Sequence, residues 1–184
     1  MKSVEWKVDE TWTLFLDRDG VINKRIMGEY VTNLTEFHFN EKVLDSIGSL
    51  TAKFKYVFVV TNQQGVALGK MTDENLNEIH NYMVSEINRV GGKITQVFSA
   101  TELKNANSQM RKPSPKMAQM AKADFPEINF EKSIMVGDTD TDIQFGKKMG
   151  MKTVLILTEE RVTEIADISV KSIYEFNNLL ELKP

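Results

Sequence analysis

The segment Leu14-Phe15-Leu16-Asp17-Arg18-Asp19-Gly20-Val21-Ile22-Asn23 joins an apolar run to two aspartates one residue apart and a glycine. A short apolar run of this kind predicts a strand that is buried on both faces. Because open parallel sheets bind ligands at the carboxyl ends of their strands, the aspartates stand where a site is expected. The alternation of side chains along extended backbone predicts that Asp17 and Asp19 lie on the same side. A plain polar turn is the alternative interpretation.

Two neighbouring carboxylates repel each other, so such a pair needs a cation or a shared proton. A hard divalent cation such as Mg2+ prefers oxygen ligands and uses one or two carboxylates together with substrate phosphate. An aspartate carboxylate is also a nucleophile that can form an aspartyl-phosphate. The pair therefore indicates phosphate chemistry, provided that other signals accompany it.

The composition is that of an ordinary globular protein, with 184 residues, of which 41% are hydrophobic and 27% charged. We expect a single domain over residues 1–184, since no repeat or change in composition divides the chain. The net charge of −3 does not favour nucleic-acid or anionic-membrane partners. The absence of cysteine excludes disulfides, thiolate catalysis and cysteine-bound metals. Without an apolar leader or a long apolar run, we expect a cytoplasmic monomer or small homo-oligomer.

Short apolar runs alternate with segments of helical periodicity along the chain. The predicted strands are Trp12–Leu16, Tyr56–Val60, Ile94–Phe98, Ser133–Val136 and Thr153–Leu157. The predicted helices are Glu41–Leu50, Thr72–Val90, Ser114–Ala123, Thr141–Met149 and Ser172–Leu182. This alternation predicts an α/β fold with a doubly wound parallel sheet sandwiched by helices. The segment Lys24–Asn40 lacks clear periodicity, and its aromatic residues favour an ordered, packed cover over the site.

Three further polar signals lie at predicted strand ends or at a helix start. Thr61-Asn62 follows the second strand, where a hydroxyl and an amide can bind phosphate oxygens. Arg111-Lys112 precedes a helix, where cations and the helix terminus together favour an anion. Gly137-Asp138 follows the fourth strand, and Asp138 is the preferred metal ligand because it is nearest the strand end. Each signal alone is compatible with a solvated turn, but their common location predicts a phosphoryl-transfer site.

On these residues the chain resembles the haloacid dehalogenase-like (HAD) superfamily of phosphohydrolases over nearly its whole length. The motifs that carry the resemblance are, in chain order, Asp17-x-Asp19-Gly20, Thr61, Lys112 and Gly137-Asp138-x-x-x-Asp142. The stretches Asp17–Asn23, Thr61–Ala67 and Arg111–Pro115 are similar to the branch that contains histidinol-phosphate phosphatase and D-glycero-D-manno-heptose 1,7-bisphosphate phosphatase. The resemblance implies a Rossmann-like fold with a minimal cap. It also implies Mg2+-dependent hydrolysis of a small phosphorylated metabolite, in carbohydrate metabolism or histidine biosynthesis.

The resemblance implies a role for each matched residue. Asp17 would be the nucleophile, and Asp19 would be first general acid and then general base. This assignment requires Asp17 to be ionised and Asp19 to be protonated in the first step. Thr61 and Lys112 would hold the transferred phosphoryl oxygens. The carboxylates of Asp17 and Asp138, with the backbone carbonyl of Asp19, would bind Mg2+.

Residues beside these motifs are assigned to supporting roles. Asp142 is expected to orient Lys112 or metal-bound water. Asn62 and Arg111 are the candidates for substrate contact, because an arginine can grip a carboxylate or a second phosphate in bidentate fashion. Gly20 is expected to permit a backbone turn that a side chain would obstruct.

Two departures from the branch leave the substrate open. Its members commonly carry a Cys/His zinc loop before the Arg-Lys-Pro sequence, whereas residues 100–110 of this chain contain no such ligand set. Other contacts must therefore order this loop, unless it is mobile. The heptose enzymes typically have an arginine where this chain has Leu68.

Three other functions compete with metabolite hydrolysis. A nucleic-acid 3′-end phosphatase would share the motifs, but the net charge of −3 and the lack of a basic stripe count against it. A catalytically silent binding domain of the same fold is a second alternative. The joint presence of both motif aspartates with Thr61, Lys112 and Asp138 counts against that alternative. A phosphomutase is disfavoured by the small cap.

Overall fold

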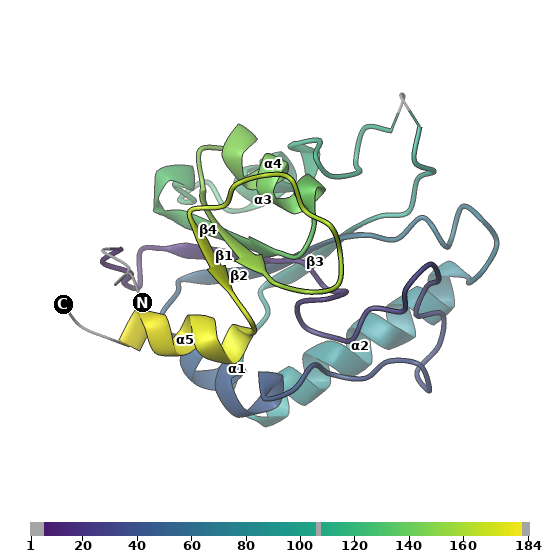
Figure 1. Ribbon diagram of the computed structural model, residues 1–184, viewed down its shortest axis with the longest axis horizontal. Helices are drawn as coiled ribbons and strands as arrows, with labels where there is room; N and C mark the ends of the chain where they lie inside the picture. Colours follow the sequence, from purple (N-terminus) through teal and green to yellow (C-terminus); the bar gives the residue numbers. More distant parts are fainter. Residues whose placement is uncertain (1–5, 106–107, 182–184) are drawn as a thin grey trace.

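The computed structural model describes residues 6–105 and 108–181, and a six-stranded parallel sheet lies at its centre (Figure 1). The strands are β1 (Thr13–Leu16), β2 (Tyr56–Asn62), β3 (Gln96–Ala100), β4 (Ser133–Gly137), β5 (Lys152–Ile156) and β6 (Ile168–Val170). Their order is β3-β2-β1-β4-β5-β6, and every neighbouring pair is parallel. Strands β2 and β3 follow β1 toward one edge of the sheet, and β5 and β6 follow β4 toward the other edge. The crevice between the ends of β1 and β4 is the switch point at which such sheets bind ligands.

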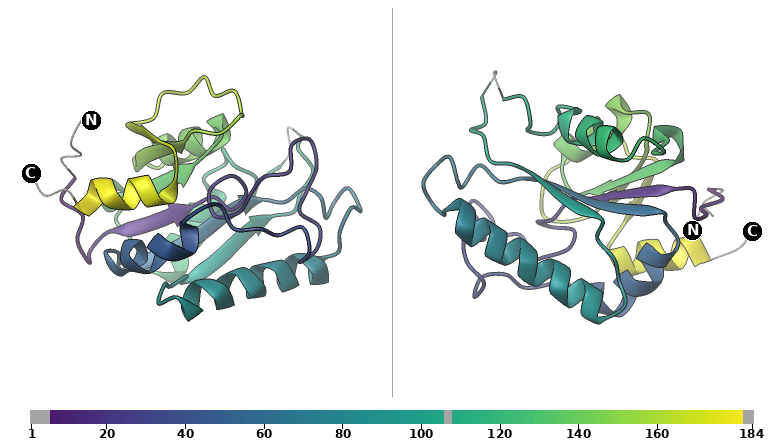
Figure 2. Two further views of the ribbon diagram at one scale, coloured as in Figure 1. Left: turned by 60° about the horizontal axis from the view of Figure 1, so that its bottom comes forward. Right: turned by 180° about the vertical axis from the view of Figure 1, so that it is seen from behind.

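Helices cover both faces of the sheet, as the sequence predicted. They are α1 (Val43–Ala52), α2 (Asp73–Arg89), α3 (Lys116–Asp124), α4 (Asp140–Lys148) and α5 (Ile173–Glu181), with a short 3-10 turn at Phe130–Lys132. Helices α1, α2 and α5 lie on one face, and α3 and α4 lie on the other (Figure 2). Leu14 and Leu16 of β1 pack into the first layer and Phe15 into the second. Consecutive residues are therefore all buried, which is why the run is apolar without alternation.

The predicted strands and helices are found close to their expected positions, with two differences. Strand β3 begins at Gln96 rather than Ile94, because Thr95 is taken up in hydrogen bonds with the backbone of Val57. Strand β6 was not predicted, since three residues with an exposed Ser169 in the middle give no apolar run. The last residue of the predicted final helix, Leu182, lies outside the described residues, as do Ala106 and Asn107 in the predicted loop.

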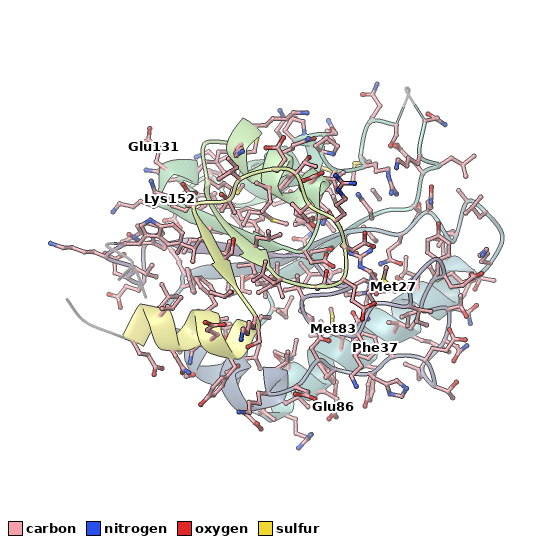
Figure 3. All side chains as sticks on the ribbon, in the orientation of Figure 1. Met27, Phe37, Met83, Glu86, Glu131 and Lys152 are labelled. Carbon is pink, nitrogen blue, oxygen red and sulfur yellow. The ribbon has the colours of Figure 1, made fainter. Side chains whose placement is uncertain are left out.

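The cover segment, residues 24–40, contains no helix or longer strand but is anchored by its aromatic residues. Phe37 is 4% exposed and packs edge-on against Phe39, with ring centroids 5.1 Å apart, and against Tyr82 of α2. Phe37 and Met83 of α2 belong to the same buried cluster (Figure 3). The expected ordered cover is thus confirmed. Among the described residues, no helix is both long and apolar enough to span a membrane.

Candidate active site

A cavity of about 350 Å³ opens at the carboxyl ends of the central strands. Six of the predicted site residues line it: Asp17, Asp19, Thr61, Asn62, Arg111 and Lys112. Asp17 and Asp19 therefore share one side, as strand geometry predicted. Asp138 is fully buried and is not part of the cavity wall. The parallel sheet has thus brought residues from four distant parts of the chain to one edge.

Lys112 stands at the centre of the site. Its Nζ lies 2.8 Å from Asp17 Oδ1 and 2.6 Å from Asp142 Oδ1, and it donates to the carbonyl of Val60 at 2.6 Å. Burial disfavours the ammonium, but the carboxylates of Asp142 and Asp17 outweigh this effect and raise the pKa of Lys112. The lysine is therefore a fixed positive charge, at the wall of a cavity that an anion can enter.

Three buried carboxylates converge beside this lysine. Asp17, Asp138 and Asp142 each offer an oxygen within 4.8 Å of the others. Burial raises the pKa of Asp17, which Asp142 raises further and Lys112 opposes. Burial likewise raises the pKa of Asp138, against its hydrogen bonds from Arg25. Oxygen donors crowded in this way are the donor set that a hard divalent cation takes.

The carboxylate of Asp142 is held by hydrogen bonds from the start of α4. Its Oδ2 accepts hydrogen bonds from the backbone N–H groups of Asp138 and Thr139 and from the Thr139 hydroxyl. This is a capping box at the start of α4. The other oxygen, Oδ1, faces Lys112. Asp142 is therefore held in a fixed position against Lys112, and its role in orienting the lysine or metal-bound water stays a prediction.

Asp19 lies in a different environment from Asp17. Burial opposes its ionisation, but the Arg18 guanidinium at 3.0 Å and hydrogen bonds from Asn23 and Gln63 outweigh burial and lower its pKa. The pKa of Asp17 is raised and the pKa of Asp19 is lowered. These directions are opposite to those expected for the first step, in which Asp17 is ionised and Asp19 is protonated. The reason is that Arg18 stands directly beside Asp19.

Arg18 and His80 were not predicted as part of the site. Arg18 is fully buried, and its Nη1 lies 3.3 Å from Nε2 of His80 on α2. Burial, assisted by Arg18, lowers the pKa of His80 to about 3, so the ring is neutral and can accept from the guanidinium. In the sequence, the only indication of this contact is the position of the positively charged Arg18 between Asp17 and Asp19.

Arg25, in the cover segment, is a second unpredicted site residue. Its Nε and Nη2 donate to the two oxygens of Asp138 at 3.0 and 2.7 Å, and Nη2 also donates to the Asp19 carbonyl at 3.0 Å. Burial opposes the charge, but these carboxylate contacts outweigh it and raise the pKa of Arg25. Arg25 therefore stays protonated and supplies a positive charge next to the acidic cluster.

The two predicted substrate contacts differ in what they already bind. Asn62 accepts a hydrogen bond from the backbone N–H of Lys112 at 2.9 Å and donates to its carbonyl at 3.3 Å. Its amide therefore holds the Lys112 backbone in place. Arg111, in contrast, has a buried Nη1 without a hydrogen-bond partner, and burial lowers its pKa. A buried donor of this kind favours an anionic ligand.

Two glycines allow the backbone to approach the carboxylates. A Cβ on Gly20, whose φ is +89°, would lie 2.0 Å from Asp138 Oδ2. A Cβ on Gly137 would lie 2.1 Å from Cβ of Asp142. The expected role of Gly20 in permitting a tight turn is confirmed, and its reason is the space that Asp138 needs.

The loop that lacks zinc ligands is closed by one carboxylate. Glu102 accepts hydrogen bonds from the Ser108 hydroxyl at 2.6 Å and the Met110 backbone N–H at 3.2 Å. The backbone N–H of Lys104 donates to Gln64, whose amide in turn donates to the hydroxyl of Tyr30 in the cover segment. Contacts other than metal ligation therefore order the described part of this loop.

The chain is similar in sequence to known phosphatases. A family model described as HAD-hydrolase-like matches residues 109–182. The D-glycero-alpha-D-manno-heptose-1,7-bisphosphate 7-phosphatase of Campylobacter jejuni is 31% identical over 152 residues, which cover 83% of this chain and 86% of that protein. The protein of the same name from Mycobacterium tuberculosis is 30% identical over 169 residues, covering 90% of this chain and 89% of its own.

The fold is shared with a solved structure. The D,D-heptose 1.7-bisphosphate phosphatase from B. bronchiseptica, complexed with magnesium and phosphate, superposes with a TM-score of 0.82. The two chains are 24% identical, and the match covers 92% of this chain and 98% of that one. With the sequence relatives spanning most of both chains, this protein belongs to the haloacid dehalogenase-like superfamily of phosphatases.

Proposed function

We propose that this phosphatase hydrolyses a phosphomonoester of a sugar bisphosphate, of the heptose 1,7-bisphosphate type, through an aspartyl-phosphate and with Mg2+. The observation that carries the proposal is the cluster of three buried carboxylates beside the cavity, two of which pair with Lys112. The names of the Campylobacter and Mycobacterium relatives support the sugar class. The magnesium and phosphate complex of the B. bronchiseptica protein supports the ion.

The residues present fit a divalent cation. The carboxylates of Asp17 and Asp138 and the carbonyl of Asp19 would hold Mg2+, because these oxygens already converge on a single cationic group, that of Arg25. The ion would neutralise charge on the phosphoryl oxygens and on the attacking carboxylate.

In this proposal the carboxylate of Asp17 attacks phosphorus. An Asp17 oxygen forms the new bond, the bond from phosphorus to the sugar oxygen breaks, and that oxygen takes a proton from Asp19. Because the pKa of Asp19 is lowered, Asp19 must first gain this proton from solvent. Water then hydrolyses the aspartyl-phosphate, and Asp19 takes the proton of the water. The lowered pKa of Asp19 favours this second step, in which it acts as a base. Thr61 and Lys112 hold the transferred oxygens, so the protein contributes positioning and charge neutralisation.

A second anionic group on the substrate is supported by the outer wall of the cavity. Arg111 offers a buried guanidinium nitrogen without a partner, and Lys104 lines the same wall. Leu68, at the position where heptose enzymes typically carry arginine, is 48% exposed and does not line the cavity. Arg111 is therefore the residue that we assign to the phosphate that is not cleaved.

The experiment is phosphate release from heptose 1,7-bisphosphate, a sugar monophosphate and a 3′-phosphorylated oligonucleotide, with Mg2+ and with EDTA. We expect the bisphosphate to be preferred, EDTA to abolish release, and Asp17→Asn to be inactive with every substrate. Preference for the oligonucleotide would overturn the substrate class. Full activity of Asp17→Asn would overturn the aspartyl-phosphate.

A further inference from the structure

The guanidinium of Arg25 contacts four oxygens in the acidic cluster. Its Nη2 lies 2.7 Å from Asp138 Oδ1, 3.0 Å from the carbonyl of Asp19 and 3.8 Å from Asp17 Oδ2. Its Nε donates to the second oxygen of Asp138 at 3.0 Å. These contacts tie the cover segment to the nearby end of β1 and to the end of β4, where Asp138 lies 113 positions away in sequence.

The same oxygens are those assigned above to the divalent cation. A bound Mg2+ would lie about 2.0–2.1 Å from each of its oxygen ligands, which leaves no room for a nitrogen on those lone pairs. The guanidinium and the ion therefore exclude each other from these oxygens. We propose that Arg25 is an intramolecular competitor of the divalent cation, and that it must leave Asp17, Asp19 and Asp138 before the ion binds. This inference rests on the metal ligands of the proposed function.

Arg25 is placed to leave, unlike its neighbour Arg18. The Arg25 side chain is 26% exposed and belongs to a segment without regular secondary structure, whereas Arg18 is fully buried. Glu160, which lines the same cavity, has a carboxylate oxygen 4.0 Å from Arg25 Nε. A small rotation of the side chain therefore exchanges one carboxylate partner for another.

Only molecules in which Arg25 is displaced can bind the cation. The apparent dissociation constant therefore equals the intrinsic one divided by the fraction of such molecules. Alternative states of folded proteins are typically populated at about 0.1–10%, so removing the competitor should tighten binding by about tenfold or more. Loss of the arginine also leaves the buried carboxylates with less counter-charge. The variant should therefore be less stable without divalent cation and gain more from its addition.

The test is a titration with Mn2+, followed by the electron paramagnetic resonance signal of the free ion. Arg25→Gln is compared with the wild type and with Lys24→Gln, which removes the same charge from an exposed side chain one residue away. We expect Arg25→Gln to bind Mn2+ about tenfold tighter or more, and Lys24→Gln to change little. Arg25→Lys, which keeps the charge but loses the two-pronged contact, should lie between them. Equal or weaker binding in Arg25→Gln, relative to Lys24→Gln, overturns the proposal.

Thermal unfolding with and without MgCl2 gives a readout that does not depend on turnover. The gain in melting temperature should be larger for Arg25→Gln than for Lys24→Gln, and an equal gain would contradict the competition. Asp138→Asn separates the two proposals. If it abolishes Mn2+ binding while Arg25→Gln has no effect, only the competition is wrong. If it leaves binding unchanged, the ligand set itself is wrong and both proposals fail.

Discussion

The inner and outer parts of the cavity differ in how they are built. The inner group consists of Asp17, Thr61, Lys112, Asp138 and Asp142. Each is at most 5% exposed and lies at a strand end, in the first turn of α4 or just before α3. The rim group consists of Tyr30, Gln64, Lys104, Arg111 and Glu160, all of which lie in loops and retain exposed surface. From this difference we expect the proposed chemistry to depend on residues held by the sheet, and the choice of substrate to depend on the connecting segments.

The strongest test of this contrast is Lys112→Met in the inner group. Because Asp17 and Asp142 both pair with this ammonium, its removal leaves two buried carboxylates without their partner. We expect activity to fall by about 10²–10³-fold and the free energy of unfolding by about 3–5 kcal/mol. Phosphate release and urea unfolding measure the two effects. Lys116→Met, on the exposed side of α3, is the control, and equal losses in both variants would contradict the assignment.

Arg111→Gln tests the rim. The guanidinium has a buried nitrogen without a partner, so its loss should remove substrate binding while the inner group stays intact. We expect KM for the bisphosphate to rise by about tenfold with kcat nearly unchanged. KM for a monophosphate should change less, because that substrate has no second phosphate to lose. A fall in kcat with KM unchanged would place Arg111 in the chemical step instead.

His80 tests whether the inner group is supported from α2. Its pKa is lowered by burial and by Arg18 to about 3, below the value of about 6.5 in the unfolded chain. Below about pH 6.5, His80 therefore becomes protonated in the unfolded state but stays neutral in the folded state. The contribution of His80 to the free energy of unfolding is therefore complete above about pH 6.5. It decreases as the pH drops toward about 3, with a slope of at most about 1.4 kcal/mol per pH unit.

Removing the histidine should remove this contribution. His80→Gln is expected to lose less stability between pH 7 and 5 than the wild type, as measured by urea unfolding. His38→Gln is the matched control, since His38 is exposed in the cover segment. Parallel pH profiles for His80→Gln and the wild type would show that the buried histidine is not responsible.

Glu102→Gln should give the smallest effect. The side chain closes the rim loop through Ser108 and Met110 but touches none of the inner group. We expect kcat/KM to change by no more than about twofold, as for most surface substitutions. Hydrogen exchange at the Met110 amide should become faster, because its acceptor is weakened. A large loss of activity would mean that the loop positions the inner group after all.

The sequence was sufficient for most of the inner group. Apolar runs located the strands, and the polar residues that follow them, such as Asp17 and Asp138, were placed at one edge by the parallel topology alone. Strand β6 was missed because its three residues carry no periodic signal. Roles for these residues stay predictions until the variants are measured.

The sequence did not reveal contacts that depend on how distant segments meet. Arg25 and Asp138 are 113 positions apart, and Arg18 and His80 are 62 apart. No local pattern encodes such pairs, since each depends on the path of the cover segment or on the packing of α2. The raised pKa of Asp17 comes first from its burial, and the lowered pKa of Asp19 comes from Arg18, Asn23 and Gln63. Both depend on how the folded chain packs around the two carboxylates.

The rim loop has a consequence for how this protein could diversify. Its described part leaves the sheet after β3 and is held by the carboxylate of Glu102, and among its described residues only Met110 packs against a buried cluster. A segment closed on itself can be exchanged for another of different length with little cost to the rest of the fold. We therefore expect that exchanging this loop would change which metabolites enter while the catalytic frame stays the same.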